Sequence, residues 1–181
     1  MKILLLTSFT FALATLCFSQ KTVADLKPIH AVALEQFLSK NKNYQFLSER
    51  AFDEEYLKDL RKDFGKSINP YYCVSDFNFD GVLDFALILS RKGEATIAEG
   101  TEITPYDHNY PLAVIIFNGN KKGGFTKAFV EDIEAPLVCL IKTDGVGKEK
   151  QVFFAVYATD ADTRIFTPIG KGYIIEYPEE P

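Results

Sequence analysis

The 181-residue sequence has few of the residues on which most catalytic and metal signatures depend. It contains no tryptophan, one methionine, three cysteines and two histidines, His30 and His108. No paired Cys-x-x-Cys or Cys/His spacing indicates zinc or redox chemistry. The G-x-S-x-G, H-E-x-x-H and dinucleotide-binding patterns are also missing. An enzyme would have to rely on His108 or on the close pair Asp160 and Asp162, which we interpret first as turn residues.

Long apolar runs are also scarce, and the longest lies at the start of the chain. Residues 3–16 are apolar or hydroxylic, Lys2 precedes them, and a small residue, Ser19, follows. The run is shorter than the roughly twenty residues that span a bilayer, and its flanks are typical of a secretory signal peptide. We therefore predict a signal peptide over residues 1–19 and one domain over residues 20–181. The mature chain would be exported to the periplasm or beyond, without an integral membrane segment.

The cysteines are compatible with export, but the sequence does not decide whether two of them form a disulfide. Cys17 would leave with the signal peptide, and bulky Leu16 before it argues against a lipid-anchored form. Cys73 and Cys139 each lie in a strand-like run. In an oxidising compartment they would form one disulfide, whereas the alternative is two buried thiols that act as small hydrophobic side chains.

Charge of one sign is not concentrated in this chain. Twenty basic and 25 acidic residues give a formal net charge of −5. A mildly acidic surface argues against nucleic acid or anionic lipid as a partner. Hydrophobic residues make up 47% of the chain and aromatic residues 14%, which is enough to fill a core.

The order of patterns predicts an α+β fold. Residues 21–43 and residues 48–64 carry apolar side chains at helical spacing. After Tyr71 the pattern changes to β-branched and aromatic runs separated by turn residues. We expect strands within residues 71–74, 83–89, 93–103, 112–117, 125–130, 137–142, 151–159 and 171–177. The prediction is two N-terminal helices packed on a mostly antiparallel, curled sheet of about five or six strands.

The most informative stretch is residues 76–84, Asp-Phe-Asn-Phe-Asp-Gly-Val-Leu-Asp. Gly81 permits a sharp turn that would let oxygen atoms converge on a hard cation. The predicted calcium ligands are the side chains of Asp76, Asn78, Asp80 and Asp84 and the backbone carbonyl of Val82. The alternative is a metal-free β-hairpin, because Asp-Gly is a favoured turn. Turn preference alone, however, requires neither Asp76 nor Asp84.

The pattern D-x-N-x-D-G-x-x-D, followed here by Phe85 and Ala86, resembles the calcium loop of FG-GAP and VCBS-type repeats. That resemblance implies calcium as the cofactor and the aspartates and asparagine of the pattern as its ligands. It covers about fifteen residues and occurs once, so it implies no propeller. An EF-hand would place a glutamate at the twelfth position, where this chain has Leu87.

These features favour an exported, calcium-stabilised interaction module with a protein or glycan partner and no nucleic acid. The polar loop at residues 106–110 is the candidate recognition surface, because aromatic residues on a loop provide contact area at low entropic cost. Two alternatives remain open. One is a secreted hydrolase with a calcium-supported site, and the other is an inhibitor or immunity-type protein.

Overall fold

The computed structural model describes residues 26–47, 54–66, 69–92, 96–97, 108–135, 138–143, 151–156 and 163–177. The predicted signal peptide, the Asp160 and Asp162 pair, and residues 106–107 of the candidate recognition loop lie outside these ranges, whereas residues 108–110 of that loop form the start of a strand. Within the described ranges, neither helix is both long and apolar enough to cross a membrane.

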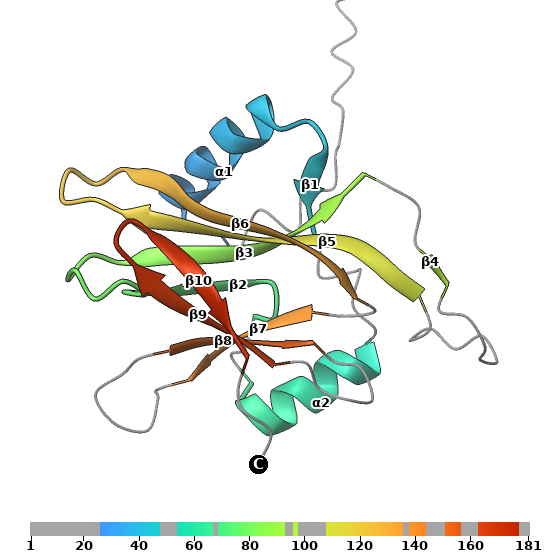
Figure 1. Cartoon of the computed structure of the whole chain (residues 1–181). Helices are drawn as coiled ribbons and strands as arrows, with labels where there is room; N and C mark the ends of the chain where they lie inside the picture. Colours follow the sequence, from blue (N-terminus) through green and yellow to red (C-terminus); the bar gives the residue numbers. More distant parts are fainter. Residues whose placement is uncertain are drawn as a thin grey trace, which may run out of the picture.

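The described residues form two helices and ten strands, joined by turns and loops (Figure 1). In chain order these elements are α1 Pro28–Lys40, β1 Tyr44–Phe46, α2 Glu54–Phe64, β2 Tyr72–Ser75, β3 Asp84–Arg91, β4 Thr96–Ile97, β5 His108–Gly119, β6 Phe125–Ala135, β7 Val138–Thr143, β8 Gln151–Val156, β9 Thr163–Ile169 and β10 Gly172–Glu176.

The strands form two antiparallel sheets. In the six-stranded sheet, β3 pairs with β1 and β2 on one side and with β5 on the other, and β5 pairs with β6 and β4. In the four-stranded sheet, β7 to β10 follow one another as a meander. The two sheets approach each other where β7 runs beside β2, and there the Leu140 amide donates to the Pro70 carbonyl at 2.7 Å. The arrangement is therefore curled but not closed.

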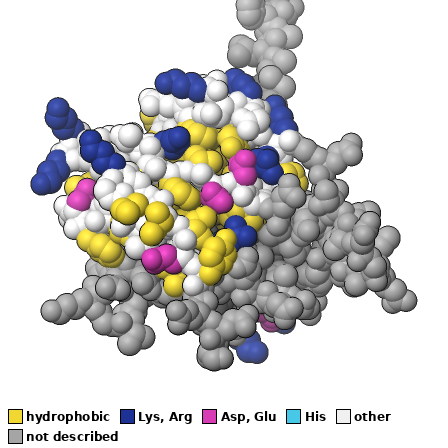
Figure 2. Space-filling model, viewed as in Figure 1, with side chains coloured by type: hydrophobic (Ala, Val, Ile, Leu, Met, Phe, Trp, Pro, Cys, Tyr) yellow, Lys and Arg dark blue, Asp and Glu magenta, His cyan; other side chains and the backbone are white. Residues whose placement is uncertain are grey.

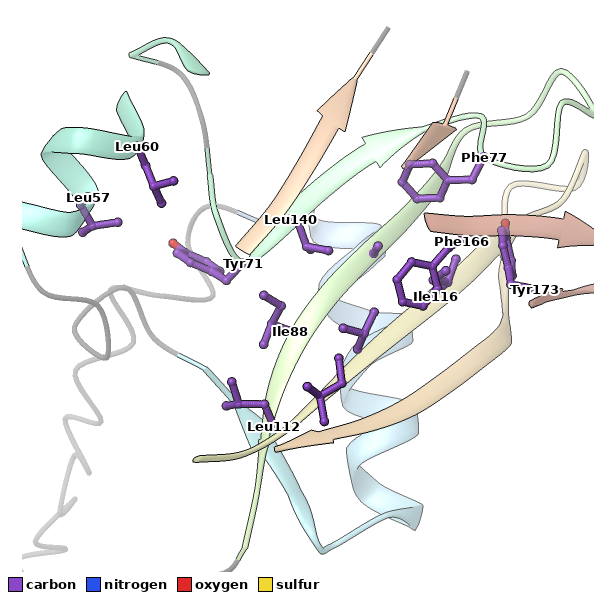
Figure 3. Packing of buried hydrophobic residues seen from close by; sticks show 13 residues of the cluster. Leu57, Leu60, Tyr71, Phe77, Ile88, Leu112, Ile116, Leu140, Phe166 and Tyr173 are labelled. Atoms are coloured by element: carbon purple, nitrogen blue, oxygen red, sulfur yellow. The ribbon is translucent and has the colours of Figure 1, made fainter. Parts of the chain in front are cut away.

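The main core lies between the two sheets. Figure 3 shows Ile88 of β3 and Ile116 of β5 facing Leu140 of β7 and Phe166 of β9 across this space. The opposite face of β3 and β5 is covered by α1, so both strands are buried on both faces. This explains why their apolar residues fill both alternating sets, as in strands covered on each side.

The predicted arrangement of the helices is wrong, and so is the α+β class, since the molecule is mostly sheet. The helices do not form one layer. Leu34 and Phe37 of α1 pack on the face of β3 and β5 that points away from the second sheet. Leu57 and Leu60 of α2 pack in the core between the sheets. A second sheet covers the face of β3 and β5 that α1 does not cover, whereas we expected two helices packed on one sheet. Helical periodicity shows that a face is apolar, but it does not show which surface covers that face. The antiparallel pairing itself is confirmed.

Candidate functional site

The candidate site is the loop between β2 and β3, residues 76–83, which we call the corner loop. It lies beside the end of β5, where Gly119 contacts it, and near Tyr173 of β10. Both sheets therefore contribute to its surroundings. Phe77 points inward and is buried in the main core (Figure 3). Phe79 is about half exposed.

Short polar side chains hold the corner loop in shape by binding its backbone amides. The two carboxylate oxygens of Asp76 accept from the amides of Asp80 at 3.1 Å and Gly81 at 2.9 Å. Asn78 Oδ1 accepts from the Asp80 amide at 3.0 Å, and Asp80 Oδ1 accepts from the Val82 amide at 2.9 Å. Turns closed by hydrogen bonds from backbone amides to a nearby side chain are characteristic of Asp and Asn. They fold residues 76–82 into a compact loop with its oxygen atoms close together.

Two residues of this loop adopt left-handed backbone conformations. Gly81 has φ +85° and Phe79 has φ +61°. Glycine takes this conformation without steric cost, whereas a bulky aromatic residue rarely does. Among the described non-glycine residues, Phe79 alone has a positive φ.

Asp84 fastens the corner loop to the six-stranded sheet. Its carboxylate is fully buried and accepts three backbone amides, from Phe77 at 2.9 Å, Asn78 at 3.3 Å and Gly119 at 2.8 Å. Burial raises the pKa of the Asp84 carboxyl, while these amides act in the opposite direction. All three partners are donors, so the ionised carboxylate is the form that the surroundings satisfy.

Gly119 lets β5 approach the corner loop. A Cβ atom at this position would lie 2.3 Å from the Leu83 carbonyl oxygen and 2.9 Å from Val82 Cγ1. The first of these neighbours is backbone and cannot rotate away. Only glycine therefore fits while its amide stays bonded to Asp84.

Tyr173 brings the second sheet to the same corner. Its hydroxyl donates to Asn118 Oδ1 at 2.8 Å, and its side chain is buried. Burial raises the pKa of Tyr173, and the negative charges of Asp84, Asp76 and Asp80 raise it further. The three carboxylates thus act together on one buried hydroxyl group.

The structure brings Asp76, Asn78 and Asp80 together but turns Asp84 inward. In the part of the chain that it describes, no group of three or more His, Cys, Asp or Glu side chains is placed to hold a metal ion. A plain Asp-Gly turn would require neither Asp76 nor Asp84, but both accept backbone amides here. Asp76 closes the loop, and Asp84 fastens it to the sheet. Calcium binding therefore stays a prediction.

Sequence reasoning missed Gly119, Asn118 and Tyr173. The sequence places Asn118 and Gly119 only between the predicted strands at 112–117 and 125–130, and Tyr173 only within the predicted strand at 171–177. Nothing local to these positions indicates that they meet the corner loop, because the contacts bridge 35 residues for Gly119 and Asp84 and 55 residues for Tyr173 and Asn118.

His30 and Cys73 both pack against buried hydrophobic side chains. His30 is buried, stacks on Phe85 with ring centroids 4.3 Å apart, and shares a hydrogen bond of 2.6 Å between Nδ1 and the Tyr72 hydroxyl. Burial and the charge of Lys27 lower its pKa to about 4. Cys73 is partly buried against the main core, and its predicted disulfide with Cys139 stays a prediction.

Comparison of the sequence with protein-family models and curated proteins, and with solved structures, finds no match. The likeness of the corner loop to a calcium repeat therefore rests on the residues of the loop alone.

Proposed function

We propose that this protein is an exported interaction module whose corner loop binds one calcium ion in a structural role. The observation that carries the proposal is the clustering of Asp76, Asn78 and Asp80 by mutual and backbone hydrogen bonds beside the buried Asp84. These oxygen-bearing groups are of the type that calcium prefers.

The hydrogen bonds leave acceptor capacity for an ion. A carboxylate has about four lone-pair sites. Asp76 uses two of them for backbone amides, Asp80 uses one for a backbone amide and one for the Asn78 side-chain amide, and Asp84 uses three. The Val82 carbonyl would add a further oxygen. A divalent cation would also relieve the repulsion among the carboxylates.

The competing interpretation is a metal-free corner in which the same aspartates only cap amides. Thermal unfolding with and without calcium separates the two. With a dissociation constant on the order of 10⁻⁴ to 10⁻³ M, about 5 mM calcium stabilises the folded state by roughly 1 to 2 kcal/mol. That corresponds to a rise in Tm of roughly 2 to 8 °C for a chain of this size.

Asp80→Asn is the sharpest variant, because it keeps an oxygen for the Val82 amide and removes one charge. We expect it to retain most of the stability measured in EDTA and to lose the calcium-dependent rise in Tm. Asp59→Asn, at an exposed position on α2, is the matched control and should behave like the unaltered protein. An unaltered protein whose Tm ignores calcium, or an Asp80→Asn variant with the full rise, would refute the proposal.

A further inference from the structure

Three turns lie together at one end of the molecule (Figure 1). They are the corner loop, the β5–β6 turn at residues 120–124 and the β9–β10 turn at residues 170–171. Asp84 directly follows the first turn and Gly119 directly precedes the second, and the bond between them holds these two turns side by side. For the third turn, a Cβ on Gly172 would lie 3.7 Å from the Ala128 carbonyl oxygen of β6. We call this end the turn surface.

The turn surface combines exposed apolar side chains with lysines. The apolar ones are Phe79, Leu83 and Ile169, with exposed fractions of 48%, 53% and 58%. The exposed lysines are Lys121, Lys122 and Lys171. Figure 2 shows Lys and Arg side chains gathered over the β5–β6 turn, with hydrophobic side chains on the same face of the molecule.

The fold does not require these apolar side chains. Phe79 holds a left-handed conformation that Asn or Gly would adopt more cheaply. Leu83 and Ile169 expose more than half of their surface next to turns, where polar residues are usual. Backbone strain and exposed apolar surface at neighbouring turns point to a binding role.

We infer that the turn surface docks onto a bilayer that contains anionic phospholipid. The apolar tips would enter the boundary between headgroups and acyl chains, while the lysines would pair with phosphate. This names the partner of the proposed interaction module and so rests on that proposal. A calcium ion at Asp76 and Asp80 would make this end more positive.

The net charge of −5 does not oppose this inference, although it led us to expect no anionic lipid partner. Charges separated by more than about 8 to 10 Å are screened at physiological salt, so a membrane responds mainly to the end that faces it. The composition also favours lipid over a protein partner. Protein interfaces are enriched in aromatic residues and Arg and depleted in Lys, whereas this end presents three lysines and one aromatic residue, Phe79.

Co-sedimentation with vesicles tests the inference. We expect the protein to bind vesicles of phosphatidylcholine with roughly one third phosphatidylserine, and to bind them more strongly in calcium than in EDTA. Binding to pure phosphatidylcholine should be much weaker. Because each lysine contributes roughly fivefold to partition onto such a surface, Lys121→Glu with Lys122→Glu should reduce it at least about 25-fold.

Matched control variants distinguish a specific role of the turn surface from a general effect of altered charge or apolar area. Lys58→Glu with Lys62→Glu makes the same change on exposed positions of α2 and should leave partition unchanged. Leu83→Ser should weaken binding, whereas Val32→Ser, at an exposed position on α1, should not. The inference fails if anionic and neutral vesicles bind equally, or if the α2 pair loses as much binding as the turn pair.

The Tm of the same samples, measured in calcium and in EDTA, distinguishes failure of the membrane inference from failure of the calcium proposal. A protein with a calcium-dependent rise in Tm and no binding to anionic vesicles overturns the membrane inference only. A protein that binds anionic vesicles through the turn surface in EDTA, with no calcium-dependent rise in Tm, supports the membrane inference and overturns calcium binding.

Discussion

Gly119→Ala should be one of the most damaging single-methyl additions in the described residues. The new Cβ would lie 2.3 Å from the Leu83 carbonyl oxygen, so β5 and the corner loop must separate. Overpacking of this kind costs about 1 to 3 kcal/mol. Separation also weakens the 2.8 Å bond from the Gly119 amide to buried Asp84, and hydrogen bonds to charged groups contribute roughly 1.5 to 3 kcal/mol. The expected total is about 3 to 5 kcal/mol of unfolding free energy.

Gly172→Ala provides the matched control, because it also adds one methyl group to a strand glycine. Its nearest neighbour would be the Ala128 carbonyl oxygen at 3.7 Å, which is ordinary van der Waals contact. Alanine also has less conformational freedom in the unfolded chain than glycine. We therefore expect a change between zero and a gain of about 1 kcal/mol.

Urea unfolding of both variants, followed by circular dichroism, measures the difference. The midpoint should fall clearly for Gly119→Ala and hold or rise for Gly172→Ala, with similar slopes if both remain two-state. Addition of Asp84→Asn to Gly119→Ala should cost less than Asp84→Asn alone, because the two changes disrupt the same bond. Equal midpoints for Gly119→Ala and Gly172→Ala would show that β5 does not approach the corner loop as described.

Two further predictions concern His30 and export. The pKa of His30 is about 4 in the folded protein and 6.5 in the reference state, so the unfolded chain binds the proton more readily. Stability should be complete above pH 6.5 and fall as the pH drops towards 4, by up to about 3 kcal/mol at 1.36 kcal/mol per pKa unit. His30→Gln should flatten that part of the urea midpoint against pH, and an unaltered slope would exclude His30 as its source. If residues 1–19 are a signal peptide, mass spectrometry of the exported chain should find Gln20 at its start, and an intact N-terminus would contradict export by this route.

The corner loop shows how far local sequence can specify a site. The alternation of Asp76, Asn78 and Asp80 before Gly81 predicted a tight turn lined with oxygen atoms, and the structure has one. Short Asp and Asn side chains reach amides only a few residues away, so their spacing carries this information. The same spacing could not reveal that Asp84 turns inward to bind Gly119.

The fold divides in a similar way. Apolar residues occupy both alternating sets of β3 and β5, a pattern typical of strands covered on each face, and both strands are buried in this way. The sequence patterns also predicted antiparallel hairpins. They did not distinguish one sheet covered by two helices from two sheets with α1 outside them and α2 packed into the core between them, because either arrangement can bury the same apolar strands.

The sequence by itself therefore determined most of the extended segments and the point where the chain turns around closely spaced oxygen atoms. These properties depend on residues within a few positions of one another. Only the tertiary structure decided that a second sheet covers β3 and β5, that Gly119 and Tyr173 meet the corner loop, and that three turns share one end. Those outcomes depend on contacts between segments far apart in the chain, and hydrophobic periodicity does not specify which apolar faces meet.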